Sequence, residues 1–162
     1  MERRDKMNYY LDIAQTVAER STCLRRCYGA IIVKNDEIVS SGYNGAPRVR
    51  KNCSDLNYCT REALNIPSGQ RYALCRSAHP EANAIISASR QEMLGATMYM
   101  ACISPVTGEL IPDSSSCMMC RKLIINAGIK EIVIRDTAAD YRVVDINDWI
   151  ENDDSLPENL DF

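Results

Sequence analysis

The chain has 162 residues, of which 46% are hydrophobic, and its formal net charge at pH 7 is −3. This length and composition suit one compact domain with a substantial core, and no apolar run approaches the roughly 18 residues of a membrane span. Five acidic residues and no basic residue fall in residues 151–162, so the rest of the chain is nearly neutral. A nearly neutral body with an acidic tail argues against a nucleic-acid-binding protein.

The chain contains eight cysteines, and its first residues lead into a helical pattern instead of a signal peptide. Without an export signal, the thiols are expected to stay reduced and to serve metal binding or packing. We therefore predict a cytoplasmic protein with a single domain over residues 1–151 and an acidic C-terminal tail over residues 152–162.

The first half of the chain predicts a helix and then a hairpin. Residues 5–20 carry apolar side chains at helical spacing and predict an amphipathic helix. Residues 28–33 and 37–43 predict two antiparallel strands, because β-branched residues lie on both sides of a turn signal. Residues 44–78 show little periodicity apart from a short helix near 60–64, and so long an irregular stretch needs an internal frame.

The second half alternates helices and strands. It predicts a helix over 79–91, a buried strand over 96–103, a loop or small hairpin over 104–115, a helix over 117–127, a strand over 130–135, an edge strand over 143–146 and a last helical turn over 148–151. The acidic end is expected to fray. Strands that alternate with helices after an initial hairpin predict a three-layer α/β/α domain with a mixed sheet.

The single histidine and one cysteine pair have the pattern of a zinc site. His79 lies at the start of a predicted helix, and Cys117 and Cys120 lie at the start of the next long one. One imidazole and two thiolates supply the three protein ligands of a hydrolytic zinc ion and leave one position for water. His79 alone would more often be a core histidine, and the cysteines alone a structural half-site. Together, and in this order, they predict a catalytic zinc.

Glu81 is predicted to be the catalytic base of this site. Two thiolates neutralise the zinc charge, so the metal acidifies water less than one held by three histidines, and a nearby base becomes useful. Helix N-termini aimed at the metal further favour thiolate and hydroxide. Glu81, two residues after His79, can take a proton from zinc-bound water and pass it to the ring nitrogen and the leaving amine.

The His-x-Glu and Cys-x-x-Cys spacing resembles the cytidine and deoxycytidylate deaminase superfamily. Further similar segments are 23–26, 29–33, 41–47, 66–69 and 123–129, so the resemblance covers roughly residues 5–136. It implies a cytidine deaminase-like fold with a five-stranded sheet, in which both metal-bearing helices start at the carboxyl edge of the sheet.

The resemblance implies zinc-dependent hydrolysis of deoxycytidylate (dCMP) to deoxyuridylate (dUMP) and ammonia, which supplies dUMP for thymidylate synthesis. The asparagine of the Gly-Tyr-Asn-Gly stretch contacts the nucleotide in that family, which implies this role for Asn44; the alternative is an ordinary Asn-Gly turn. Arg26 is hypothesised to hold the 5′-phosphate together with Asn44. Family members are often oligomers regulated by the triphosphates dCTP and dTTP, which implies a homo-oligomer, a hexamer or a dimer, with these effectors.

Four further cysteines form a second constellation: Cys23, Cys53, Cys59 and Cys75. Some relatives in this family carry an additional structural zinc here, and four thiolates would close a tetrahedral site and frame the long loop. The alternative is four buried or idle thiols, and Cys27 is a possible substitute for Cys23. Cys102, in a predicted strand, is expected to belong to the core.

Three departures from the family pattern bear on specificity. Pro80 replaces an alanine whose backbone N–H is expected to bond the pyrimidine carbonyl; proline has no N–H, although it suits the first position of a helix. Ser116 replaces the proline before the first metal cysteine and should leave the ligands intact. Residues 104–115 are longer than the family's connection and should lie beside the active-site mouth.

The alternatives are a deaminase of another small cytosine or of a purine- or pterin-like compound, a nucleic-acid-editing deaminase, and a non-catalytic zinc-stabilised nucleotide sensor. The lack of a strongly basic composition argues against editing. The presence of Glu81 argues against a sensor, because a structural zinc needs no positioned base.

Overall fold

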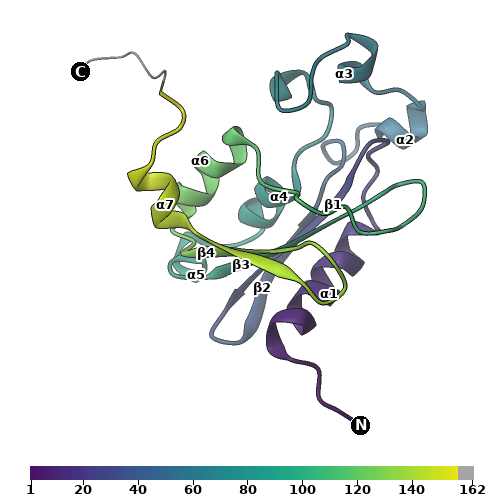
Figure 1. The fold of residues 1–162 in the computed structure, drawn as a ribbon. Helices are drawn as coiled ribbons and strands as arrows, with labels where there is room; N and C mark the ends of the chain where they lie inside the picture. The colour runs from purple at the N-terminus through teal and green to yellow at the C-terminus, as the bar shows by residue number, and fades with distance from the viewer. Residues whose placement is uncertain (157–162) are drawn as a thin grey trace.

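The computed structural model describes residues 1–156, in which a five-stranded sheet lies between two layers of helices (Figure 1). The strand order is β2-β1-β3-β4-β5; β3 and β4 run parallel, and the other neighbouring pairs run antiparallel. The strands are β1 (Cys27–Lys34), β2 (Glu37–Tyr43), β3 (Thr97–Ile103), β4 (Glu131–Arg135) and β5 (Tyr141–Asp145). The predicted α/β/α architecture with a five-stranded mixed sheet is confirmed.

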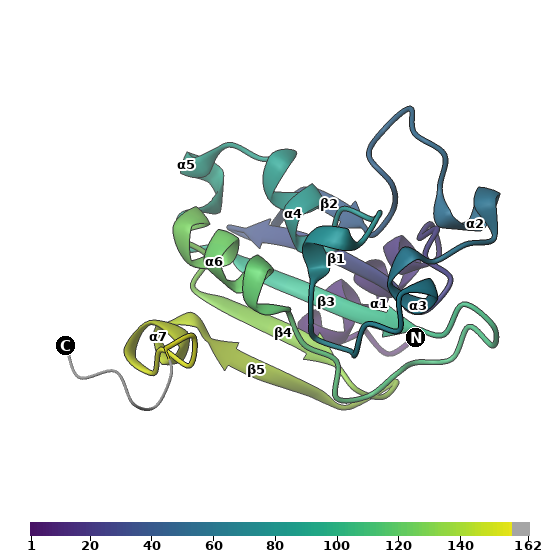
Figure 2. The same cartoon turned by 90° about the horizontal axis from the view of Figure 1, so that it is seen from above.

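Helices cover both faces of the sheet (Figure 2). Because side chains alternate along a strand, Ile31 of β1 packs in one cluster with α1 (Lys6–Ala18), whereas Ile32 packs in another with α4 (Pro80–Ile86) and α6 (Met118–Ala127). The shorter helices are α2 (Cys53–Leu56), α3 (Thr60–Ala63), the 3₁₀ helix η1 (Tyr72–Leu74), α5 (Arg90–Met93) and α7 (Ile146–Glu151). No helix within residues 1–156 has the length and apolar character that crossing a membrane requires.

The prediction of one continuous helix over residues 79–91 is wrong. Helix α4 ends at Ile86, and a separate helix α5 begins at Arg90. Ser89 caps α5: its hydroxyl accepts from the Glu92 N–H at 3.3 Å, and the Glu92 carboxylate accepts from the Ser89 N–H at 3.0 Å. This capping box stabilises a new helix start, so apolar periodicity continues across a break in the backbone helix.

The C-terminal elements are present with shifted bounds. Asp145 accepts from the Asn147 N–H at 2.9 Å and caps α7, so Ile146 belongs to the helix and not to strand β5. The loop after β3 is a small hairpin with an isolated bridge between Ile103 and Leu110, as predicted. The predicted acidic tail falls largely on residues 157–162, outside the described residues, and the division into domain and tail stays a prediction.

Strand β2 holds α4 close through Gly42. A Cβ atom at Gly42 would lie 2.3 Å from the Pro80 carbonyl oxygen and 2.5 Å from the Ala84 nitrogen. The Ser40 hydroxyl donates to the Ala84 carbonyl at 2.8 Å, and the Asn83 amide donates to the Tyr43 carbonyl at 2.8 Å. Strand β2 therefore sets the position of α4 and of the residues at its N-terminus.

Candidate active site and metal centre

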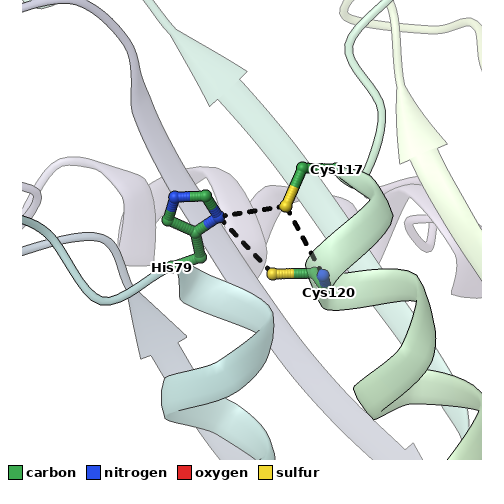
Figure 3. A group of neighbouring side chains, drawn as sticks. All are labelled: His79, Cys117 and Cys120. Atoms are coloured by element: carbon green, nitrogen blue, oxygen red, sulfur yellow. Dashed lines mark hydrogen bonds between the residues drawn. The ribbon is translucent and has the colours of Figure 1, made fainter. Parts of the chain in front are cut away.

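Two helix N-termini bring His79, Cys117 and Cys120 together (Figure 3). His79 is the N-cap residue of α4, and Pro80 follows at the first position, where a missing N–H breaks no helical hydrogen bond. Cys117 is the N-cap residue of α6, and its Sγ accepts from the Cys120 N–H at 3.4 Å. The helix starts thus orient the imidazole and both thiols toward one point.

The spacing of these three groups fits a zinc ion. His79 Nδ1 lies 3.4 Å from Cys117 Sγ and 3.5 Å from Cys120 Sγ. Zinc bonds of about 2.1 Å to nitrogen and 2.3 Å to sulfur, at a tetrahedral angle, would separate the two atoms by roughly 3.6 Å. Within residues 1–156, only these three residues form a group of three or more possible metal ligands whose ligand atoms all lie within 4.8 Å of one another. We call His79, Cys117 and Cys120 the metal group. Three ligands leave the fourth tetrahedral position free for a water molecule.

Proton sharing shows how strongly the three groups interact. The hydrogen bond from Cys120, followed by that from His79, lowers the pKa of Cys117 to about 4, whereas the same hydrogen bond with Cys117 raises the pKa of Cys120. Burial lowers the pKa of His79, but its hydrogen bonds with Cys117 and Cys75 outweigh burial and raise it to about 10. Negative charge therefore concentrates on sulfur, and a divalent cation would replace the shared protons.

Glu81 lies in the first turn of α4 and is only 3% exposed. Burial raises the pKa of its carboxyl group; a hydrogen bond from its own backbone opposes the increase most, followed by the Ser116 hydroxyl and His79. Ser116 Oγ is itself buried and makes no hydrogen bond of ordinary geometry within the described residues. A buried carboxyl with a raised pKa beside a metal group suits proton transfer near neutral pH.

The metal group opens onto a cavity of about 380 Å³ that Glu81, Asn44 and Arg26 also line. The Asn44 side chain has three protein partners: its carbonyl accepts from the Tyr28 N–H at 2.8 Å and from the Ser21 hydroxyl at 2.5 Å, and its amide donates to the Arg26 carbonyl at 2.9 Å. Asn44 therefore holds the wall of the cavity, and its contact with a nucleotide stays a prediction. Ser115, at the end of the long 104–115 segment, also lines the cavity, as expected.

The four cysteines of the second constellation line the same cavity: Cys23, Cys53, Cys59 and Cys75. Their sulfur atoms do not form a ligand group, because no three of them lie within 4.8 Å of one another in the described chain. Burial raises the pKa of Cys75, but the hydrogen bond with His79 and its other polar contacts lower it overall. The second zinc stays a prediction, whereas Cys102 is fully buried in β3 as predicted.

Arg61 and Tyr72 are cavity residues that the sequence pattern did not indicate. The Tyr72 ring meets the His79 ring edge-on, with centroids 4.9 Å apart, and the Arg61 guanidinium carbon lies 4.2 Å from the Tyr72 centroid. Both come from the irregular segment 44–78, in which periodicity carries no information about side-chain direction.

A zinc-fitting group at paired helix N-termini, with a buried carboxyl that does not belong to the group, is characteristic of zinc-dependent base deaminases. Comparison with known proteins gives the same class. The chain belongs to the cytidine and deoxycytidylate deaminase family, whose zinc-binding region matches residues 4–136.

Individual relatives agree with this assignment. A deoxycytidylate deaminase of Mycobacterium phage D29 is 36% identical over 138 residues, which cover 82% of this chain and 96% of the phage protein. One from Schizosaccharomyces pombe is 31% identical over 126 residues, which cover 78% of this chain but only 35% of the yeast protein. The crystal structure of dCMP deaminase from cyanophage S-TIM5 in apo form has the same fold, with a TM-score of 0.58 and 24% identity over 85% of this chain and 88% of that one.

Proposed function

We propose that this protein is a zinc-dependent deaminase that converts dCMP into dUMP with release of ammonia and so supplies dUMP for thymidylate synthesis. The observation that carries the proposal is the convergence of His79, Cys117 and Cys120 on one point, at a cavity that the buried Glu81 also lines. The family membership supports the proposal. So does the deoxycytidylate deaminase of phage D29, because the match covers nearly the whole phage protein.

In this proposal, His79 Nδ1 and the thiolates of Cys117 and Cys120 hold the metal. A bound Zn²⁺ supplies activation of water for attack on the pyrimidine. The Glu81 carboxylate accepts one proton from the attacking water and passes it to the ring nitrogen; it then accepts the second proton, from the added hydroxyl group, and passes it to the amine, which leaves as ammonia. Burial of Glu81 keeps bulk water from exchanging this proton during the reaction.

The charge of the cavity favours an anionic substrate. Four arginines line it: Arg25, Arg26, Arg61 and Arg76. The carboxylates that line it are those of Glu62, which pairs with Arg25 at 3.4 Å, and Glu81. A cavity with this excess of positive charge attracts a nucleotide more strongly than an uncharged nucleoside. We infer that Arg26 and Asn44 belong to the nucleotide-binding wall.

We further propose that the protein is a cytoplasmic homo-oligomer, a dimer or a hexamer, with dCTP and dTTP as effectors. Exposed apolar side chains on two helices that contact each other, Ile86 of α4 and Met119 and Leu123 of α6, support association. A second, structural zinc held by the cysteines of the long loop is part of the same proposal.

Steady-state kinetics with ammonia detection test the proposed reaction. We expect efficient turnover of dCMP, weaker turnover of deoxycytidine, and rates that respond to dCTP and dTTP. Glu81→Gln should keep its zinc while kcat falls by at least ~10²-fold, since it removes a general base. A preference for deoxycytidine would overturn the substrate, and equal turnover by the Gln variant would remove Glu81 from the mechanism. Hyperbolic rates that neither triphosphate changes would overturn the regulation.

A further inference from the structure

Arg61 is a buried cation in the cavity wall that pairs with no carboxylate among residues 1–156. The residue is 7% exposed, and its Nη2 donates to the Pro67 carbonyl at 2.9 Å. Its Nε is buried without a hydrogen-bond partner among residues 1–156. No carboxylate oxygen of that part of the chain lies within 4 Å of its guanidinium nitrogens.

Two other arginines show how unusual this arrangement is. Arg135 is the second buried arginine of the described chain, and its Nη1 lies 2.7 Å from the Asp12 carboxylate. Arg25 lines the same cavity as Arg61, but it is partly exposed and pairs with Glu62. Thus Arg61 alone among these three is both buried and without a carboxylate.

Burying an unpaired guanidinium is unfavourable, and arginine cannot escape the penalty by losing its proton. The Tyr72 ring, whose centroid lies 4.2 Å from the guanidinium carbon, offsets part of the penalty through a cation–π contact, but it supplies no hydrogen-bond acceptor for the unpartnered Nε. A planar fork of donors in a cavity wall matches the geometry of a phosphate group.

The position of Arg61 relative to the metal group fits the length of a nucleotide. Contacts of 4.2 Å and 4.9 Å connect its guanidinium, through Tyr72, to the imidazole of His79. A nucleotide likewise places a sugar between its base and its phosphate. With the base beside His79 and Glu81, a phosphate at the other end of the nucleotide would be within reach of Arg61.

We propose that Arg61 binds the 5′-phosphate of the substrate and is a residue by which the cavity distinguishes the monophosphate from the free nucleoside. This inference rests on the proposed function and adds to it a specificity residue from the irregular loop. Arg26, which is exposed, contributes charge at the rim, whereas Arg61 contributes directed hydrogen bonds from a buried position.

The test compares Arg61→Gln with the matched control Arg4→Gln, which removes the same charge from an exposed position outside the cavity, where Arg4 pairs with Asp12 at 2.9 Å. Charge-assisted hydrogen bonds predict that Arg61→Gln lowers kcat/KM for dCMP by about 10- to 100-fold, mainly through KM, while kcat/KM for deoxycytidine changes by less than about 3-fold. Arg4→Gln should change both by less than about 3-fold. Zinc content and the thermal midpoint are measured for every variant.

A purely structural role of Arg61 predicts a different result. If Arg61 only holds Tyr72 against His79, then Arg61→Gln should lower turnover of dCMP and deoxycytidine equally and weaken zinc binding. That outcome, or an unchanged ratio between the two substrates, overturns the inference. Should Arg61→Gln fail to fold, Arg61→Lys replaces it. Lysine keeps the charge but lacks the planar fork of donors, so kcat/KM for dCMP should still fall by about 3- to 10-fold. An Arg61→Lys variant with wild-type kinetics contradicts the role.

Calorimetry separates this inference from the proposed reaction. The wild-type zinc protein should bind dCMP, and inorganic phosphate should compete with this binding. Arg61→Gln should lose most of its affinity for dCMP and most of the competition by phosphate. If the wild type binds dCMP but releases no ammonia, the proposed function fails and the binding role of Arg61 is still tested. Absence of binding by the wild type, or equal binding by the variant, overturns the role of Arg61.

Discussion

Substituting Gly42 should disturb the metal group from a position that contacts none of its ligands. Gly42 lies on β2 and faces the first turns of α4, which begin directly after His79 and include Glu81. In Gly42→Ala, the new methyl group would lie 2.3 Å from the Pro80 carbonyl oxygen and 2.5 Å from the Ala84 nitrogen. These are backbone atoms, so no side-chain rotation relieves the contact.

The size of the effect follows from these distances. Ordinary contact needs roughly 3.5 Å, so the first turns of α4 must move away from β2 by about 1 Å. Overpacking of this kind lowers the free energy of unfolding by about 1–3 kcal/mol. A displacement of about 1 Å in catalytic groups can lower the rate by ~10²-fold. Because His79 moves with α4 while the two cysteines stay on α6, zinc should also dissociate more readily.

The measurements are zinc release to a competing chelator, kcat with dCMP, and urea unfolding. Gly29→Ala is the matched control, because its methyl group would lie 2.2 Å from the Ala14 carbonyl oxygen of α1, on the opposite face of the sheet. Both variants should lose stability, and only Gly42→Ala should lose zinc affinity and turnover while still folded. If zinc release and kcat are unchanged in Gly42→Ala, the claim that β2 sets the position of the metal group is refuted.

Three further predictions concern the cysteine loop and two polar networks. If the four loop cysteines bind a second zinc, elemental analysis should find two zinc ions per wild-type chain. Cys59→Ser should lose one of them and have a lower thermal midpoint. A count of one zinc in wild-type protein that was not exposed to chelator contradicts the second site. Burial raises the pKa of Asp12, but hydrogen bonds from Arg4 and Arg135 outweigh burial and lower it. The ionised Asp12 carboxylate therefore stabilises the fold above its unfolded-state pKa, and this contribution is lost as the pH falls through its folded-state pKa. Asp12→Asn should therefore lower the free energy of unfolding by about 1–2 kcal/mol at pH 7, a value reduced because the Asp12 side chain is half exposed. In urea unfolding at pH 2–3, the difference between the variant and the wild type should be smaller. Asn44→Ala leaves the part-buried Tyr28 N–H and Arg26 carbonyl without their side-chain partner and should lower the free energy of urea unfolding by about 2–4 kcal/mol; an unchanged midpoint would contradict its structural role.

The fold and the metal group were accessible from sequence because strong local rules govern both. Zinc chemistry restricts the ligands to a few residue types, and the helix N-terminus restricts their spacing, so one histidine and a Cys-x-x-Cys pair stand out. The buried strands Thr97–Ile103 and Glu131–Arg135 consist mostly of apolar residues. These features depend on neighbours in the chain, which a sequence displays directly.

The errors arose where capping competes with periodicity. Apolar spacing continues from α4 into α5, but the reciprocal hydrogen bonds of Ser89 and Glu92 start a second helix. At the other end, Asp145 belongs to β5 and also caps α7, so one residue ends the strand and begins the helix. Periodicity predicts which face is buried, whereas side-chain hydrogen bonds at single positions decide where a helix begins.

The sequence does not distinguish a buried arginine from an exposed one, and this limits what it says about substrate recognition. The adjacent pair Arg25 and Arg26 attracts attention as a cluster, yet Arg25 is paired with Glu62 and Arg26 is exposed. Arg61 lies in a four-residue helix beside an acid, a context typical of solvated surface, and only the path of the loop buries it against Tyr72. A charge acquires a role in recognition when the fold removes its water and supplies no carboxylate, because a ligand must then provide the missing partner. In this cavity that condition holds for Arg61 and not for the arginines that the sequence pattern emphasises.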